Sequence, residues 1–441
     1  MSEIKVNKIS PRTACGTTTL GDSGDTFTIP AGVTITNNGT QTGFGREGSV
    51  DWQTTIKTGD FTAASGEGYF VNTTSGPITM TLPSSPSAGD IVGFKDYGNT
   101  FDTHALTINR NSSKIEGQTQ NPTVEVEGQA VILVFTDSTQ GWKVVEQGKT
   151  ADITFAEFIQ ATGGTVTTVC TNYKVHTFTG PGTFCVSAAG NAAGSNEISY
   201  MVVGGGGGGK NGGGGAGGFR EGKTPQCSYT SSPIACTSGS NNGLPVAVAA
   251  YPVTVGGGGG TSTKGSDSVF TGTTTITSTG GGLGGNFCGS QPGGTGGSGG
   301  GGGGGPNPGN GAAPGGAGNT PPVSPSQGFP GGSGYHLCGS HFSGGGGGGA
   351  TTVGASKPSG PAPQTPFGNG GTGATTSING SATAFAGGGG AQCNYGTAGT
   401  GGTGGGGNGS GNNPGTTNTG GGGGGSGSGG SGIVIIRYKF Q

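Results

Sequence analysis

Few residues of this chain have the types and spacing that catalysis or metal binding requires. Polysaccharide hydrolysis needs two carboxylates that flank the scissile bond, yet the only acidic residues after residue 200 are Glu221 and Asp267, and long glycine runs separate them. The segment 336–341, His-Leu-Cys-Gly-Ser-His, supplies three of the four side chains that bind a structural zinc ion. We therefore predict that the protein is not an enzyme and uses neither a metal nor a cofactor.

The cysteines offer two local pairs. None of the eight cysteines belongs to a C-x-x-C motif of the kind found in zinc ribbons and thiol redox enzymes. Cys227 with Cys236, and Cys170 with Cys185, are close enough in sequence to form disulfides in an oxidising medium. The alternative is that these thiols are free and buried as small apolar side chains.

Aromatic residues that interrupt the glycine are the candidates for a binding site. They lie between glycine runs, often beside proline or asparagine, and they are Tyr229, Phe287, Phe329, Tyr335, Phe342, Phe367 and Tyr395. Rigid aromatic side chains on loops suit the recognition of sugars or of protein loops. The alternative is that they close the ends of a glycine bundle or pack on neighbouring strands, and the sequence favours neither role.

The elements that hold these loops must consist largely of glycine. Glycine accounts for 112 of the 441 residues, and 87 of them follow residue 200. Collagen requires glycine at every third position, whereas this chain has unbroken runs such as 204–209, 299–305, 344–349 and 420–425. Collagen is therefore excluded, and too few apolar residues are present for an ordinary core.

The end of the chain favours an ordered bundle over a disordered tail. Glycine-rich composition alone is typical of flexible linkers, but residues 433–440, Ile-Val-Ile-Ile-Arg-Tyr-Lys-Phe, have high β-propensity. Because such a segment promotes aggregation when exposed, we expect it to pair with residues 197–203 or 244–255. The glycine runs between these strands would then be polyglycine II helices, whose backbone groups bond to neighbouring runs.

Residues 46–150 have the pattern of a compact β domain. Short runs of alternating apolar and polar residues recur between turn signals, which is typical of a β-sandwich or a small barrel. The predicted strands are 69–71, 78–82, 91–94, 105–108, 123–126, 130–135 and 142–145.

The regions on either side complete an all-β chain. Residues 1–45 hold short alternating stretches at 27–29 and 33–36 but too little apolar area for a monomeric core, so they need other copies of the chain or a docking surface. Residues 151–164 are interpreted as a connector. Residues 165–441 form the glycine-rich domain, with strands predicted at 165–169, 173–178, 183–186, 197–203, 244–255, 273–278 and 433–440.

Charge and hydropathy exclude several classes of partner. The formal net charge is −2, and the basic residues form no patch that could follow a phosphate backbone, so we predict no nucleic-acid binding. No apolar run approaches the length of a transmembrane helix. The first residues, Met-Ser-Glu-Ile-Lys-Val, lack the apolar segment of a secretory signal.

Two sets of motifs resemble known proteins. The segment 78–145, with Ile-Thr-Met-Thr-Leu-Pro-Ser-Ser-Pro, Leu-Thr-Ile-Asn-Arg-Asn and Gly-Trp-Lys-Val, is similar to a domain that recurs in tail fibres of marine bacteriophages. The stretches 5–11 and 21–30 resemble the N-termini of such fibres. The region 200–438 resembles the glycine-rich tip domains of phage adhesins, in which polyglycine II helices stack and the loops between them contact the host receptor.

The resemblance implies a function. We expect a homotrimeric tail fibre of the virion that acts outside the host cell, with residues 1–45 bound to a phage tail or baseplate protein. The loops of the tip would bind a host polysaccharide or an outer-membrane protein by non-catalytic, multivalent contacts. One alternative is a purely structural fibre or filament subunit whose bundle is a stiff rod, and another is a depolymerase.

Overall fold

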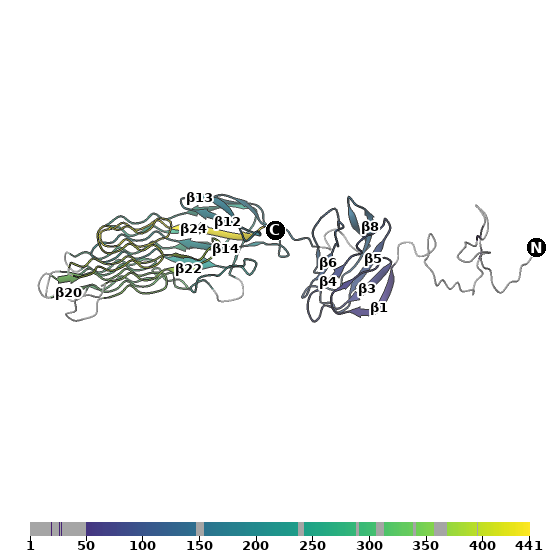
Figure 1. Cartoon of the computed structure of the whole chain (residues 1–441), viewed down its shortest axis with the longest axis horizontal. Coiled ribbons are helices and arrows are strands. Elements are labelled where there is room, and N and C mark those ends of the chain that lie inside the picture. The colour runs from purple at the N-terminus through teal and green to yellow at the C-terminus, as the bar shows by residue number, and fades with distance from the viewer. Residues whose placement is uncertain are drawn as a thin grey trace, which may run out of the picture.

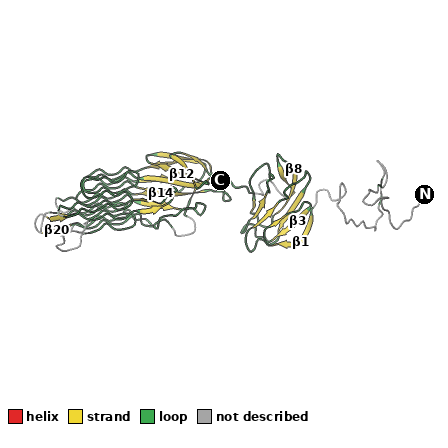
Figure 2. Cartoon of the chain, in the orientation of Figure 1, coloured by secondary structure: helices red, strands yellow, loops and turns green. Residues whose placement is uncertain are grey.

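The computed structural model describes residues 50–146, 154–236, 242–287, 291–305, 313–337, 341–356, 368–394 and 396–441, together with the single positions 19, 26 and 28. These residues form strands and loops, and no helix occurs among them (Figure 2). The chain is therefore all-β, as predicted. The attachment region 1–45, with its predicted strands 27–29 and 33–36, lies outside the described residues apart from those single positions.

Residues 50–146 form two facing sheets around one apolar core. The strand order is β1-β3-β5-β8-β9 in one sheet and β2-β4-β6-β7 in the other. Phe94, Leu106, Leu133 and Trp142 are fully buried between them. The strands are β1 (Asp51–Lys57), β2 (Phe61–Thr62), β3 (Glu67–Val71), β4 (Ile78–Thr81), β5 (Ile91–Asp96), β6 (Leu106–Asn109), β7 (Thr123–Val124), β8 (Ala130–Asp137) and β9 (Gly141–Glu146).

The path of the chain through these sheets was not predicted. Each of the first six strands lies in the opposite sheet from the one before it, so β1, β3 and β5 pair in parallel and so do β2, β4 and β6. Only β7, β8 and β9 pair antiparallel to their neighbours. Alternating hydrophobicity identifies a strand with one buried face but does not tell a parallel neighbour from an antiparallel one. Neither sheet closes into a barrel.

Two further sheets open the glycine-rich domain and enclose a second core with Phe184, Ile198 and Phe270. The first sheet contains β10 (Gln160–Thr162), β13 (Gly182–Ala188), β17 (Ala249–Thr254), β18 (Ser268–Thr271) and β19 (Thr275–Ser278). The second contains β11 (Thr165–Val169), β12 (Tyr173–Phe178), β24 (Ile433–Lys439), β14 (Glu197–Val203), β15 (Phe219–Gly222) and β16 (Leu244–Pro245). Residues 160–162 thus form a strand, although the sequence assigned them to the connector.

The closing strand β24 lies in the middle of the second sheet, between β12 and β14. Its predicted pairing with residues 197–203 is confirmed. Val434 and Ile436 face the core between the two sheets, whereas Ile433 and Ile435 face another core that includes the hairpin of β22 (Ala374–Thr376) and β23 (Thr383–Phe385). Because both faces of β24 are covered, its first four residues are an unbroken apolar run rather than an alternating one.

The glycine runs form a bundle whose hydrogen bonds repeat every three residues. In the run 204–209, the N–H groups of Gly204 and Gly207 donate to the run 212–218, those of Gly205 and Gly208 to the run 263–266, and those of Gly206 and Gly209 to the run 427–430. Three residues per turn is the period of polyglycine II. The neighbouring run 212–217 follows the same rule with three other partners. The predicted bundle is therefore present.

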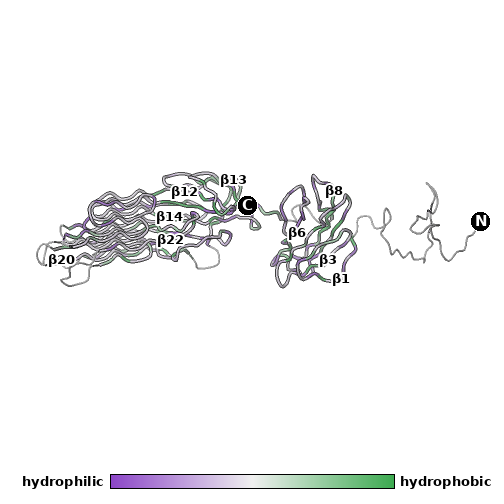
Figure 3. Tube along the Cα trace, viewed as in Figure 1, coloured by the Kyte–Doolittle hydropathy of each residue, from purple (hydrophilic) through white to green (hydrophobic). Residues whose placement is uncertain are grey.

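Close contact between backbones leaves no room for a Cβ atom at the buried glycines of this bundle. A Cβ atom at Gly213 would lie 2.0 Å from the carbonyl oxygen of Gly389, and one at Gly347 would lie 2.0 Å from that of Gly214. Figure 3 shows the result: the apolar residues lie on the strands, while the runs of the bundle are near neutral. Backbone hydrogen bonds hold the bundle, and side chains are confined to its ends and surface.

Candidate functional site

The glycine runs turn back at the end of the bundle opposite the sheets, which we call the distal end. The hairpin of β20 (Tyr335–Leu337) and β21 (His341–Ser343) lies there, far from β12, β14 and β24 (Figure 1). The other end, where the strands lie, is the strand end. Turns at the distal end connect runs that are bonded on several sides, so a rigid core holds them in place.

Loops from distant parts of the sequence enclose a pocket of about 540 Å³ at the distal end, which we call the distal pocket. Its lining residues are Lys210, Asn211, Thr261, Ser262, Asn286, Phe287, Gln392, Asn412 and Ser426. Amide and hydroxyl side chains, each able to donate and to accept hydrogen bonds, predominate. The volume is within the range of about 300–1,000 Å³ found for small-molecule sites.

Asn211 is the most constrained of the lining residues. Its side chain is 4% exposed, and its Oδ1 atom accepts a hydrogen bond of 2.6 Å from the backbone N–H of Gly304. Its backbone carbonyl accepts another, of 2.9 Å, from Gln392. The Nδ2 atom is buried and has no hydrogen-bond partner among the described residues. Because Oδ1 is engaged, the amide cannot turn over without losing a bond, and Nδ2 is left as an unpaired donor.

Sequence reasoning missed Asn211. A signal was present, because Lys210 and Asn211 are the only residues other than glycine between 204 and 215. A Lys-Asn pair between glycine runs is also what an ordinary turn looks like. Only the packing of the run that contains Gly304 shows that this asparagine is buried, with a hydrogen bond to its Oδ1 atom and none from its Nδ2 atom.

Three of the predicted aromatic residues lie at the distal end. Phe287 lines the distal pocket, and its ring packs against that of Phe342 with centroids 4.0 Å apart. Tyr335 lies on β20 and pairs in register with Ser343 on β21. All three side chains are half-buried. Phe367 and Tyr395 are outside the described residues.

The other two predicted aromatic residues lie at the strand end. Phe329 is part of a run: its N–H donates to Gly349 and its carbonyl accepts from Gly299. Tyr229 packs against the core beside β24, with the guanidinium of Arg437 5.1 Å from its ring centroid. Burial raises the pKa of the Tyr229 phenol. The predicted set is therefore divided between the two ends.

The two acidic residues that follow residue 200 lie in different surroundings. Glu221 is 2% exposed, and its carboxylate accepts hydrogen bonds from the Thr376 hydroxyl (2.6 Å) and the Ser232 N–H (2.8 Å). Burial raises the pKa of this carboxyl. Asp267 is exposed, and its Oδ1 accepts from the N–H of Gly280 (2.9 Å). No sequence pattern predicts that Glu221 is buried, and its hydrogen bond to Thr376 joins β15 to β22.

Arg437 is a buried cation on the same side of the second sheet. It is 1% exposed and donates to the backbone carbonyls of Ser228 (3.0 Å), Ser377 and Ile378 (both 3.3 Å). Its guanidinium lies 4.6 Å from the ring centroid of Tyr173. These contacts join β24 to two loops, which is a structural role.

Neither predicted disulfide is present. Cys227 is a buried free thiol whose Sγ contacts the carbonyl of Arg437 at 3.6 Å. Cys170 and Cys185 are exposed free thiols in different sheets, one at the end of β11 and the other in β13. The alternative of a buried thiol therefore applies to Cys227. Among the described residues, no three side chains of the metal-binding types are grouped; Cys338 of the segment 336–341 lies outside them.

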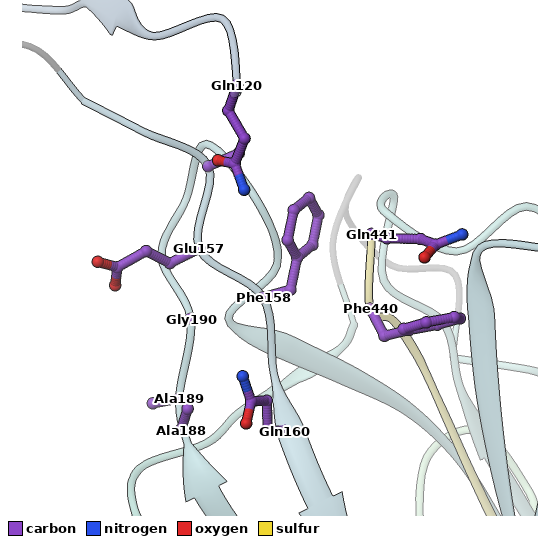
Figure 4. A pocket seen from close by; sticks show the side chains of 10 residues that line it. Gln120, Glu157, Phe158, Gln160, Ala188, Ala189, Gly190, Phe440 and Gln441 are labelled. Atoms are coloured by element: carbon purple, nitrogen blue, oxygen red, sulfur yellow. The ribbon is translucent and has the colours of Figure 1, made fainter. Parts of the chain in front are cut away.

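A second pocket, of about 690 Å³, lies at the strand end (Figure 4). Phe158 and Phe440 contribute its rings, and the amides of Gln120 and Gln160 lie nearby. Each ring already faces a cation: Lys439 Nζ is 5.3 Å from the Phe158 centroid, and Lys174 Nζ is 4.6 Å from that of Phe440. Because both rings are already engaged in contacts within the chain, we interpret the second pocket as a junction between chain segments. The distal pocket remains the candidate site.

Comparison with known proteins identifies the family. A family model that describes a glycine-rich domain matches residues 179–439, more than half of the chain. The chain therefore belongs to the glycine-rich domain family. No curated protein matches it. Within the described residues, no helix has the length and apolar character needed to cross a bilayer.

Proposed function

We propose that this member of the glycine-rich domain family is a bacteriophage tail fibre that attaches the virion to its host cell through the loops of the distal end. The attachment is non-catalytic binding to a molecule on the cell surface. It takes place outside the cell and is followed by no chemical step in this chain.

The observation that carries the proposal is the division of the domain into two ends. The chain enters the domain through β10 and finishes with β24, both at the strand end. Neither of these two strands lies at the distal end, yet a hydrogen-bonded core holds the loops of that end in fixed positions. Rigidly held loops at a free end are well suited to recognition, because little conformational entropy is lost when they bind.

The distal pocket has the chemistry of a binding site. Its described lining residues include no carboxylate, no histidine and no cysteine, so they do not supply the pair of acids of a glycosidase. Amides and hydroxyls recognise a ligand through hydrogen bonds without changing it. This supports an adhesin over a depolymerase.

Several copies would act together. The resemblance of residues 5–11, 21–30 and 78–145 to tail fibres supports a homotrimer that is held on the phage tail or baseplate by residues 1–45. Three tips on one fibre raise avidity through effective concentration, even where each site binds weakly. The mass of the intact protein in solution should then be about three times 42.0 kDa, and a monomeric mass would contradict the trimer.

The test is binding of the fluorescently labelled, full-length protein to a panel of marine bacterial strains. We expect saturable binding to at least one strain. The double variant Thr261→Arg/Asn412→Arg, which fills the mouth of the distal pocket with exposed arginines, should abolish it. The matched control Thr271→Arg/Thr275→Arg adds the same charge at exposed positions of β18 and β19 and should bind normally.

Three results would overturn the proposal. Binding to no strain, or equal binding by both variants, would favour a purely structural rod without receptor contact. Release of reducing sugar from the polysaccharide of a bound strain would make the protein a depolymerase.

A further inference from the structure

We propose that the distal pocket binds a sugar that carries an acidic group, with Asn211 and Lys210 as the residues that recognise the acid. This inference rests on the proposed function, since it names the class of ligand for the same end of the domain. Its argument is nevertheless independent of any phage or host, because it starts from one buried amide.

The side-chain amide of Asn211 has a donor group that no described residue of the domain satisfies. A buried polar group without a hydrogen bond costs free energy that folding does not recover. Oδ1 holds the amide in place through the N–H of Gly304 at 2.6 Å, so Nδ2, which is buried and has no partner in the described part of the chain, keeps both of its N–H groups unpaired in a residue that lines the pocket. An oxygen atom of a ligand would satisfy it.

The charge of the pocket identifies that oxygen as acidic. Lys210 is adjacent to Asn211 and also lines the pocket, whereas no carboxylate does so among the described residues. The two acidic residues that follow residue 200 do not line the pocket. Glu221 is buried beside β22, and Asp267 accepts a hydrogen bond from the N–H of Gly280. An ammonium group beside an unpaired amide donor favours an anion.

The remaining lining residues favour a sugar as the carrier of the acid. Sugar hydroxyls both donate and accept, and so do the amides and hydroxyls of Asn286, Gln392, Asn412, Thr261 and Ser262. Protein-binding surfaces, in contrast, are apolar at their centre. Phe287 is the only apolar side chain among the described lining residues, and its contact with Phe342 holds it as a single flat surface. Such a surface suits one face of a pyranose ring.

Variants at two positions test the assignment. Asn211→Asp retains an oxygen for the Gly304 N–H but replaces the donor with a negatively charged acceptor. Lys210→Gln removes the charge and retains a polar side chain. Asn408→Asp is the matched control for the first variant, because Asn408 Oδ1 likewise accepts a backbone N–H, that of Gly401 at 2.9 Å, and Asn408 does not line the pocket. Lys264→Gln is the control for the second, since Lys264 is exposed and outside the lining.

The experiment is calorimetric titration of the full-length protein with glucuronate, galacturonate, mannuronate, N-acetylneuraminate and glucose 6-phosphate, each compared with a neutral hexose. We expect at least one acid to bind saturably and more tightly than its neutral counterpart. Asn211→Asp and Lys210→Gln should each weaken binding by at least about tenfold, the loss typical of a hydrogen bond to a charged group, whereas both controls bind as the wild type does. The carboxylate and phosphate arms show which acid the pocket prefers.

The proposal is overturned if no acid binds, if neutral sugars bind equally well, or if both pocket variants bind as tightly as their controls. Thermal unfolding of each variant shows whether it is folded. If Asn211→Asp does not fold, Lys210→Gln still decides the test. Loss of acid binding with cell attachment retained would reject the sugar but not the adhesin, and would favour a protein receptor. Acid binding by a protein that attaches to no cell would reject the adhesin alone.

Discussion

Replacement of Gly214 with alanine tests whether the bundle depends on close contact between backbones. Gly214 is buried; its N–H donates to Gly423 at 2.8 Å, and its carbonyl accepts from Gly389 at 2.9 Å. A Cβ atom there would lie 2.1 Å from the carbonyl oxygen of Gly207 and 2.8 Å from its carbonyl carbon. Because these are backbone atoms, no side-chain rotation relieves the overlap, and the runs must move apart.

The structure sets the size of the effect. Overpacking of a well-packed interior costs about 1–3 kcal/mol, and weakening the two hydrogen bonds of Gly214 adds about 1 kcal/mol for each. We expect Gly214→Ala to lower the free energy of unfolding of the glycine-rich domain by about 3–5 kcal/mol. For a domain of this size, roughly 2 °C per kcal/mol gives a fall in the unfolding midpoint of about 6–10 °C.

Gly257 provides the matched control. It also belongs to a run, and its carbonyl accepts from the N–H of Ser266, but it is exposed and a Cβ atom would meet nothing within 4 Å. Gly257→Ala should therefore be neutral, or stabilising by about 0.4–1 kcal/mol, because alanine reduces the entropy of the unfolded chain.

Calorimetry with parallel tryptophan fluorescence is the assay. Both tryptophans, Trp52 and Trp142, belong to the N-terminal β domain, so their fluorescence follows that domain alone, and calorimetry follows both. Gly214→Ala should shift only the transition that the fluorescence does not detect. Equal midpoints for Gly214→Ala and Gly257→Ala would refute the argument that backbone contact excludes every side chain from the bundle.

Glu221, Arg437 and the cysteine thiols allow three further predictions. Burial raises the pKa of the Glu221 carboxyl above its ordinary value of 4.5. The contribution of this group to stability is therefore complete below pH 4.5 and is lost as the pH rises through the raised pKa. Glu221→Gln should remove this pH-dependent component from the free energy of unfolding measured between about pH 4 and pH 8. Arg437→Lys should lower the free energy of unfolding in urea by about 2–4 kcal/mol, because one ammonium cannot replace a planar guanidinium that donates to three carbonyls. Cys170 and Cys185 should react with a thiol reagent in the native protein and Cys227 only after denaturation.

The strands could be predicted where the chain buries apolar side chains at regular intervals. Residues 433–440 were recognisable because a run of such high β-propensity is stable only when it is paired and covered, and β24 has both faces covered. Short strands such as β10 and β15 were missed, since Gln160–Thr162 and Phe219–Gly222 each contain a single large apolar residue or none. Their pairing is imposed by β13 and β14, which the local sequence does not reveal.

The site was predictable only in part. Aromatic residues at breaks in the glycine runs mark loops, but the sequence does not say at which end a run begins. Phe287 and Phe342 meet at the distal end, whereas Tyr229 contacts Arg437 at the strand end. The role of Asn211 depends on a contact with Gly304, 93 residues further along the chain, and no local pattern carries that information.

A run that contains only glycine has nothing to mark its own register. Sliding the run 204–209 by one residue would exchange one glycine for the next and preserve every hydrogen bond between runs, so residues at the ends must set the register. At the strand end, the Ser268 hydroxyl donates to the carbonyl of Val203 at 2.7 Å, and at the distal end Asn211 accepts from Gly304.

The asparagine that lines the pocket therefore also holds the run in place. If a glycine were inserted anywhere in 204–209, the run would keep its place at the strand end, which side-chain packing anchors. Because every position inside the run is glycine, the residues after the insertion would shift by one position, and the turn at Lys210 would move. Such a change alters the distal pocket while the bundle keeps its hydrogen bonds. The geometry of the binding end can thus vary without any change in the core, since the core is specified by the backbone and the binding end by the few residues that are not glycine.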